Sequence, residues 1–94
     1  MLFVIHMIDR PGGEELRASV SDAHREFVGG HLESMYLGGP LLADDGKTLV
    51  GSMIVMDFAD RAEAAAFIEQ EPYNQAGLFE SVVIRAFHPV VRPS

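Results

Sequence analysis

Apolar residues occur either in continuous runs or at helical spacing along the chain. These patterns predict four strands and two helices in the order strand, helix, strand, strand, helix, strand. The first run, Met1 to Asp9, is almost wholly apolar and predicts a strand with both faces covered. The segment Arg10 to Gly13 (Arg-Pro-Gly-Gly) ends this run, because proline and glycine interrupt regular structure. The stretch from Glu14 to Tyr36, EELRASVSDAHREFVGGHLESMY, then has the period of a helix and predicts one long amphipathic helix.

The predicted helix has faces of different chemistry. At about 100° per residue, an arc of about 40° around the first leucine predicts the buried stripe, formed by Leu16, Val20, Ala23, Phe27 and Ser34. Residues spaced seven apart form a column at the edge of that stripe: Arg17, His24 and His31. The far side, expected to face water, carries Asp22, Glu26 and Glu33. A cation and two imidazoles at this border either line a pocket or are simply the polar edge of an amphipathic helix.

The second half of the chain predicts three further strands and one helix. These are a strand from Leu37 to Ala43, a strand from Thr48 to Phe58, a helix ending at or before Glu71, and a last strand within Leu78 to Val90. The segment Asp44 to Lys47 (Asp-Asp-Gly-Lys) predicts a hairpin turn between the first two of these strands. Asp60 and Glu63 resemble a capping box at the start of the helix, and Pro72 predicts its end.

The order β-α-β-β-α-β predicts a ferredoxin-like α+β fold over a single domain, residues 1–94. In this fold an antiparallel four-stranded sheet carries both helices on one face. Strands that are apolar on both faces then leave the other face to be covered by something else. We expect a second copy of the chain to cover it, sheet against sheet, in a homodimer. The short chain favours this too, because a small domain without cysteines buries a modest share of its surface.

The charge narrows the possible partners. The net charge of −7 argues against a nucleic acid or an anionic membrane, because both bind basic surfaces. The absence of cysteine fits a reducing compartment. The N-terminus lacks the positive start of a signal peptide, and no segment is long and apolar enough to span a bilayer. We therefore expect a cytoplasmic protein.

The candidate chemistry outside the helix column is sparse. His6 lies in mid-strand and is expected to be a hydrogen-bonded core imidazole, whereas His88 is expected near the rim of the sheet. Metal binding is not expected, because no HExxH motif or cysteine pair is present. His24 and His31 are also about 10 Å apart on one helix, too far for chelation. Ser52 lacks the flanking pattern of a nucleophile elbow and is not expected to be a nucleophile.

An ordered set of landmarks over nearly the whole chain resembles the YCII-related (YciI-like) proteins, a family of the dimeric α+β barrel superfamily. The landmarks are MLFVI leading to Asp9, Arg17 leading to Ala23-His24, Gly39-Pro40, Asp45-Gly46 followed by Gly51-Ser52, and EPYNQAGLFESVVIRAF. The most family-specific piece is Pro72-Tyr73 followed by Ala76-Gly77-Leu78. No single landmark is diagnostic, but their order and spacing together are specific.

The resemblance implies a pocket between sheet and helices, with a His–Asp pair as its active site. The family histidine is matched here by His24, and we take Asp9 as its acidic partner, because it ends the first strand beside the long helix. A carboxylate on one ring nitrogen would fix the tautomer and raise the basicity of the other. Substrate-binding roles are expected for Arg17, Tyr73, Ser52 and Glu71, although Arg17 could equally form a surface ion pair and Tyr73 a hydrophobic plug over the last strand. The family usually has Asp-Pro-Tyr or Asp-Pro-Phe where this chain has Glu71-Pro72-Tyr73, so the role of Glu71 is open.

Three functions are compatible with these expectations. The first is a small cofactor-free and metal-free acid–base enzyme of the lyase or isomerase type. The family that the chain resembles includes a protein similar to a dehydrochlorinase of a hydroxylated chloroaromatic ring. The wider superfamily includes lactone isomerases and cofactor-free monooxygenases, so the resemblance implies an aromatic or lactone-like substrate. The second function is a module that binds a small organic ligand without transforming it. The third is a structural dimeric domain in which the histidine merely ties helix to strand.

Overall fold

The computed structural model describes residues 1–92. Its elements, in order, are β1 (Leu2–Asp9), α1 (Glu14–Gly29), the short 3-10 turn η1 (Leu32–Ser34), β2 (Met35–Leu42), β3 (Leu49–Asp57), α2 (Arg61–Gln70), α3 (Pro72–Gln75) and β4 (Phe79–Phe87). The four strands form one sheet in the order β2-β3-β1-β4, and every neighbouring pair is antiparallel. The predicted ferredoxin-like fold is confirmed.

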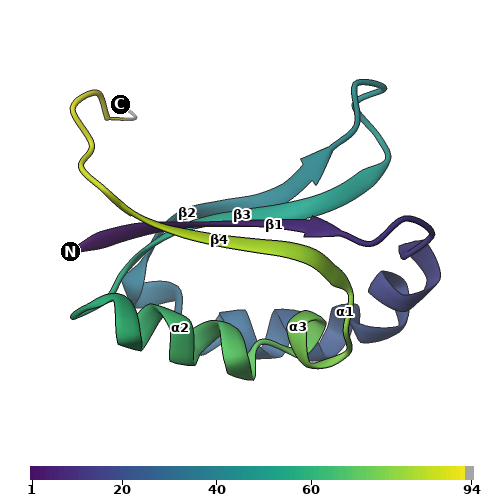
Figure 1. The fold of residues 1–94 in the computed structure, drawn as a ribbon, viewed down its shortest axis with the longest axis horizontal. Helices are drawn as coiled ribbons and strands as arrows, with labels where there is room; N and C mark the ends of the chain where they lie inside the picture. Colours follow the sequence, from purple (N-terminus) through teal and green to yellow (C-terminus); the bar gives the residue numbers. More distant parts are fainter. Residues whose placement is uncertain (93–94) are drawn as a thin grey trace.

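All of the helices lie on one side of the sheet (Figure 1). On β1, the side chains of Phe3, Ile5 and Met7 point to the helices and are almost fully buried. Register places Ile5 opposite Ile54 on β3 and Ile84 on β4, so the middle of this face is a continuous apolar layer. Within residues 1–92, no helix is long and apolar enough to cross a bilayer.

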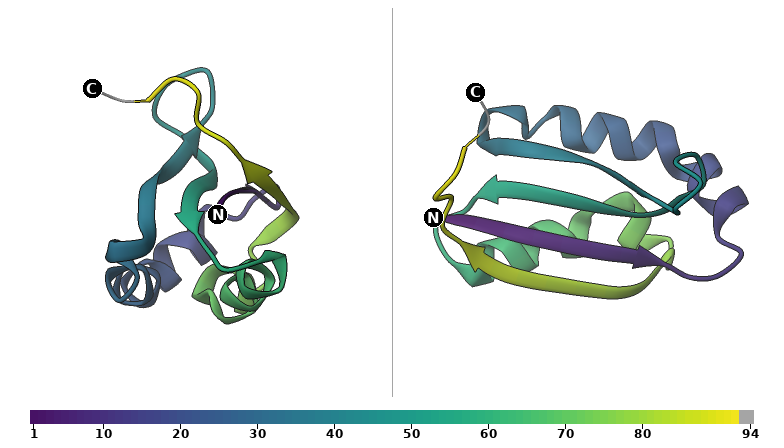
Figure 2. Two further views of the ribbon diagram at one scale, coloured as in Figure 1. Left: turned by 90° about the vertical axis from the view of Figure 1, so that its left-hand side faces the viewer. Right: turned by 90° about the horizontal axis from the view of Figure 1, so that it is seen from above.

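Among residues 1–92, no helix lies on the opposite face of the sheet. Figure 2 shows this face from above, with all four strands open to view and α1 running along the β2 edge. Its apolar side chains remain accessible, as at Leu37 on β2 and at Val83 and Phe87 on β4, which are 39%, 38% and 41% exposed. This is the face that we expect to be covered in a homodimer, and the single chain leaves the expectation untested.

The long helix differs from the prediction in its length and in the side that it buries. It ends at Gly29, and strand β2 already begins at Met35, so the expected helix to Tyr36 was too long. The double glycine favours this early end, because glycine weakens a helix interior by about 1 kcal/mol relative to alanine. Leu16, the expected centre of the buried stripe, is 38% exposed, whereas Arg17 is only 6% exposed.

The other local signals are confirmed with small changes in boundaries. The Asp60 side chain accepts a hydrogen bond from the Glu63 amide at 2.9 Å and caps α2, as the capping box predicts. Asp45 accepts from the Thr48 amide at 2.9 Å and holds the β2–β3 hairpin turn. Helix α2 ends before Pro72, which opens the single-turn helix α3. This turn brings Glu71 and Tyr73 back toward α1.

Candidate functional site

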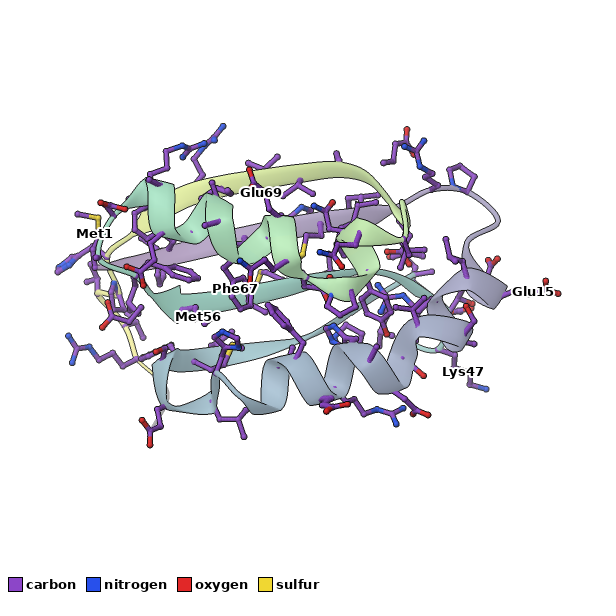
Figure 3. All side chains as sticks on the ribbon, turned by 90° about the horizontal axis from the view of Figure 1, so that it is seen from below. Met1, Glu15, Lys47, Met56, Phe67 and Glu69 are labelled. Atoms are coloured by element: carbon purple, nitrogen blue, oxygen red, sulfur yellow. The ribbon has the colours of Figure 1, made fainter. Side chains whose placement is uncertain are left out.

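A cavity of about 370 Å³ lies between α1, the β2–β3 half of the sheet and α3. Helix α1 runs along the β2 edge of the sheet (Figure 2), and its Val20 and Phe27 pack against the core only in part. In Figure 3, the side chains of Phe67 and Met56 lie inside the molecule, whereas Glu15 and Lys47 point outward from its end. Phe67 is one of the residues that line the cavity. The polar residues of the lining are Arg17, His24, Arg25, Ser52, Glu71 and Tyr73.

Arg17 is tied to the end of strand β1. Its Nε donates to Asp9 Oδ2 at 2.8 Å, and its Nη2 donates to Asp9 Oδ1 at 2.9 Å. Nη2 also donates to Ser52 Oγ on β3 at 3.1 Å. The two charged side chains are 8% and 7% exposed, so this bidentate pair is almost fully removed from water. It fixes the first turn of α1 against the central strands.

His24 forms its carboxylate pair with Glu71, which corrects the partner expected from the sequence. His24 Nδ1 lies 2.6 Å from Glu71 Oε1, and the hydrogen bonds of Asp9 go to Arg17 instead. The imidazole is 26% exposed and Glu71 is 3% exposed. An ionised carboxylate only accepts hydrogen bonds, so Nδ1 is the donor in this contact, and in a neutral imidazole Nε2 is then the basic nitrogen.

Glu71 is held for this contact by the turn that it begins. Its Oε2 accepts from the Asn74 amide at 3.3 Å, so the residue serves as the N-cap of α3. One carboxylate therefore fixes the local backbone with one oxygen and the imidazole with the other. The glutamate of this chain is long enough to make both contacts.

Tyr73 packs between the two polar pairs. Its ring stacks on the His24 imidazole, with centroids 4.2 Å apart and planes 20° from parallel. The Arg17 guanidinium carbon lies 4.6 Å from the centroid of the same ring. Because Tyr73 is 3% exposed, it fixes the positions of the imidazole and the guanidinium from the α3 side. The contacts at this site thus form one continuous network from Asp9 through Arg17, Tyr73 and His24 to Glu71.

Two pKa shifts follow from this packing. Burial disfavours the phenolate and raises the pKa of Tyr73, Glu71 adds to the effect, and Arg17 opposes it. Burial acts to lower the pKa of Arg17, but Asp9 and Tyr73 together raise it above its usual value. At neutral pH the site therefore holds a charged guanidinium beside a neutral phenol.

Two nitrogen atoms of the site remain available to a ligand. Arg17 Nη1 takes no part in the hydrogen bonds to Asp9 and Ser52, and His24 Nε2 takes no part in the bond to Glu71. The Tyr73 hydroxyl interacts with the same guanidinium. No buried side-chain nitrogen or oxygen in residues 1–92 lacks a partner, so neither nitrogen is sealed inside the protein. Both residues line the cavity. The site thus offers one fixed donor and one basic nitrogen to the same space.

The other histidines lie outside the cavity. His31 Nδ1 donates to the Phe27 carbonyl oxygen, 2.8 Å away, and the ring packs against Phe27 and Phe67. His6 is on the open face of the sheet and half-buried, rather than in the core between sheet and helices. His88 is exposed after the end of β4. Among the described residues, no three His, Cys, Asp or Glu side chains converge as a metal site, and the expected absence of metal stays a prediction.

Sequence reasoning missed the apolar wall of the cavity. Val28, Met35 and Ile54 line it, and Gly38 contributes bare backbone on β2. The available signal was the Gly38-Gly39-Pro40 interruption, which removes side chains from a strand next to the long helix. It could be recognised only once the strand was known to face the helix.

The family model for the YCII-related domain matches residues 1–88. The chain belongs to the YCII-related family. The protein YciI of Escherichia coli O6:H1 is 32% identical over 97 residues, covering 96% of this chain and 99% of that protein. The family expected from the sequence landmarks is confirmed.

Solved structures agree with the fold. The 5-chloro-2-hydroxyhydroquinone dehydrochlorinase of Burkholderia phenoliruptrix, in complex with 2,5-dihydroxybenzoquinone, superposes with a TM-score of 0.86 at 29% identity, covering 94% of each chain. An antibiotic biosynthesis monooxygenase superposes with a TM-score of 0.53 at 14% identity, covering 95% of this chain and 100% of that one. The second likeness concerns the fold alone.

Proposed function

We propose that this protein is a cofactor-free acid–base enzyme of the lyase or isomerase type, acting on a small hydroxylated ring compound. The observation that carries the proposal is the His24–Glu71 pair at the cavity, with His24 Nε2 unengaged. The similarity to a dehydrochlorinase of a hydroxylated aromatic ring supports this class of substrate. The proposal replaces the expected His–Asp pair by a His–Glu pair.

The proposed role of His24 is to accept a proton at Nε2 and to return one later in the cycle. In an elimination, the ligand loses a proton to Nε2, and the leaving group departs with the electron pair of its bond to the ring. In an isomerisation, the same imidazolium returns the proton to a different ligand atom. The carboxylate of Glu71 stabilises the imidazolium through Nδ1, as the orienting acid does in other catalytic pairs.

Arg17, Ser52 and Tyr73 are proposed to bind and orient the substrate. Arg17 Nη1 would donate to a hydroxyl, enolate or carbonyl oxygen, while the bonds to Asp9 and Ser52 keep the guanidinium in place. The Ser52 hydroxyl lies beside it, and Tyr73 forms an aromatic wall next to His24. A fixed donor near the base suits charge that develops on a ring oxygen as a proton leaves.

A direct test uses 5-chloro-2-hydroxyhydroquinone and measures chloride release with time. We expect turnover by the wild-type protein and a loss of about 10²–10⁴-fold in His24→Gln. His31→Gln is the matched control, because it changes a half-buried histidine of the same helical region that does not line the cavity. Equal turnover by His24→Gln and wild type would contradict the proposal.

The runner-up is a module that binds the same ligands without transforming them. The observation in its favour is that both charged pairs are internally satisfied, so they also hold α1 to β1 and α3. Titration with 2,5-dihydroxybenzoquinone, followed through the His24 imidazole NMR signals, distinguishes the two. Saturable binding without turnover of any hydroxylated ring or lactone would favour the module.

We further propose that the functional unit is a homodimer formed through the open sheet faces. The support is the accessible apolar surface of this face, which a helix layer does not cover. Burying such a surface against a second copy would remove apolar side chains from water on both chains.

A further inference from the structure

The cavity has a polar end and an apolar end. His24, Glu71 and Arg17 gather where α3 meets the Arg17–His24 part of α1. The lining continues past them along apolar side chains of α1, α2 and the sheet, which are Val28, Met35, Ile54, Phe67 and Ile68. A ligand that contacts His24 and Arg17 therefore leaves an apolar space beyond its ring.

The apolar end is a real extension along α1. His24 and Val28 are one helical turn apart, or roughly 6 Å along the axis, and Val28 lies on the side away from Arg17. The volume of about 370 Å³ falls in the range of sites for drug-sized molecules, roughly 300–1,000 Å³. A single hydroxylated ring at the polar end would leave this second compartment to water.

Strand β2 contributes to this extension by lacking side chains. A Cβ at Gly38 would lie 3.0 Å from Ile54 Cγ2 and 3.3 Å from Met35 Sδ, both of which line the cavity. Adding a methyl group there would force one of these side chains to move. A Cβ at the adjacent Gly39 would meet nothing within 4 Å.

The charge at the mouth favours an acidic group on the ligand. Arg25 lines the cavity, and its link to Asp22 is long, 3.4 Å, with both side chains largely exposed. An exposed pair of this kind holds its arginine weakly. Arg25 can therefore turn toward an anion whose oxygen is bound by Arg17.

We propose that the substrate of this site is an amphipathic ring compound, with an acidic hydroxyl or enol at His24 and Arg17 and an alkyl or fused-ring body in the Val28–Ile54 compartment. This inference rests on the proposed function and specifies its substrate class. The volume of the compartment determines which alkyl or fused-ring bodies the site accepts. The residues at positions 28 and 38 set that volume. A single-ring compound then fills only the polar end.

The test compares 2,5-dihydroxybenzoquinone with its 3-butyl derivative by isothermal titration calorimetry. The two probes share the acidic head and differ only in the apolar body. For the wild type we expect the butyl compound to bind at least about 10-fold more tightly. Val28→Phe should abolish this preference by filling the compartment, while the affinity for the unsubstituted ring stays within about twofold.

Ala23→Phe is the matched control, because it adds the same side chain to an exposed position of α1 outside the cavity. It should keep the butyl preference. Gly38→Ala tests the opposite wall and should reduce the preference. Gly39→Ala is its control: Gly39 lines the cavity through its backbone, but successive strand residues point to opposite faces, so its Cβ would point away from Ile54 and Met35. Reduction by either wall variant, with both controls unchanged, supports the proposal even if one variant folds poorly.

The outcomes also separate this inference from the function on which it rests. Equal affinity for both probes in the wild type would overturn the apolar compartment and leave the His24–Glu71 proposal standing. Binding of neither probe would overturn both. A butyl preference that survives Val28→Phe and Gly38→Ala together would place the apolar body elsewhere and overturn the assignment.

Discussion

Arg17 is the one residue of α1 that is buried, and it is a charged one. Its charge is tolerated because the Asp9 carboxylate accepts hydrogen bonds from two of its nitrogen atoms in a bidentate pair. A buried pair of this kind need not add stability, but losing one member leaves a desolvated charge without compensation. The pair therefore constrains both the fold and the donor that points into the cavity.

Replacing Asp9 by asparagine should lower the free energy of unfolding by about 3–5 kcal/mol, because the buried guanidinium loses its counter-charge. Urea denaturation measures the change. Asp57→Asn is a suitable control, since its carboxylate pairs with the N-terminus at an exposed position. The double variant Asp9→Leu/Arg17→Met should recover much of the loss, since it removes both charges. A cost no larger than that of the control would show that the pair is not desolvated.

Tyr73 should give the protein a pH-dependent component of stability. Burial raises the pKa of Tyr73 above its ordinary value of about 10. A group whose pKa is raised on folding stabilises the fold at low pH, and this contribution is lost as the pH rises through the folded-state value. Stability should therefore decline above about pH 10. Tyr73→Phe should show a smaller decline in urea unfolding than Tyr36→Phe, and equal declines would contradict the burial argument.

Some helices and strands could be predicted from the sequence alone, whereas the contacts between them could not. The strands and α2 were predictable because continuous apolar runs, Asp60 and Pro72 are local signals that act within a few residues. The buried side of α1 was not predictable, because hydrophobicity alone favours burial of Leu16 over burial of Arg17. The deciding contacts come from Asp9 and Tyr73, which lie in other elements and are joined to α1 only by folding. The same reason explains the partner of His24, because proximity along β1 favoured Asp9 while α3 brings Glu71 closer to the ring.

Strands β1 and β3 approach each other closely at Gly51. A Cβ at this position would collide with the backbone carbonyl oxygen of Met7, which has no flexible end to move away. Gly51→Ala should therefore destabilise the protein by more than about 4 kcal/mol or prevent folding. Gly39→Ala on β2 is the control, because its Cβ would meet no atom within 4 Å. Thermal unfolding of both variants measures the difference, and similar midpoints would contradict the close approach.

The whole molecule is a two-layer arrangement with one covered and one uncovered face. The helix layer covers the side chains of Ile5, Ile54 and Ile84 and encloses the cavity. The face of the sheet that points away from the helices has apolar residues from all four strands, and no helix of residues 1–92 covers it (Figure 2). Its coverage by a second copy is independent of the cavity chemistry, so assembly and ligand binding can be tested separately.

The proposed homodimer predicts that a charge on the open face will separate the two copies. Val83 on β4 is 38% exposed and shares this face with His6, its register partner. Val83→Glu should shift the protein from dimer to monomer in analytical ultracentrifugation, because burying an unpaired carboxylate at an apolar interface is strongly unfavourable. Leu16→Glu is matched in exposure, also 38%, but lies on α1 and should leave the assembly unchanged. A wild-type monomer, or a Val83→Glu dimer as stable as the Leu16→Glu dimer, would show that this face is not the interface.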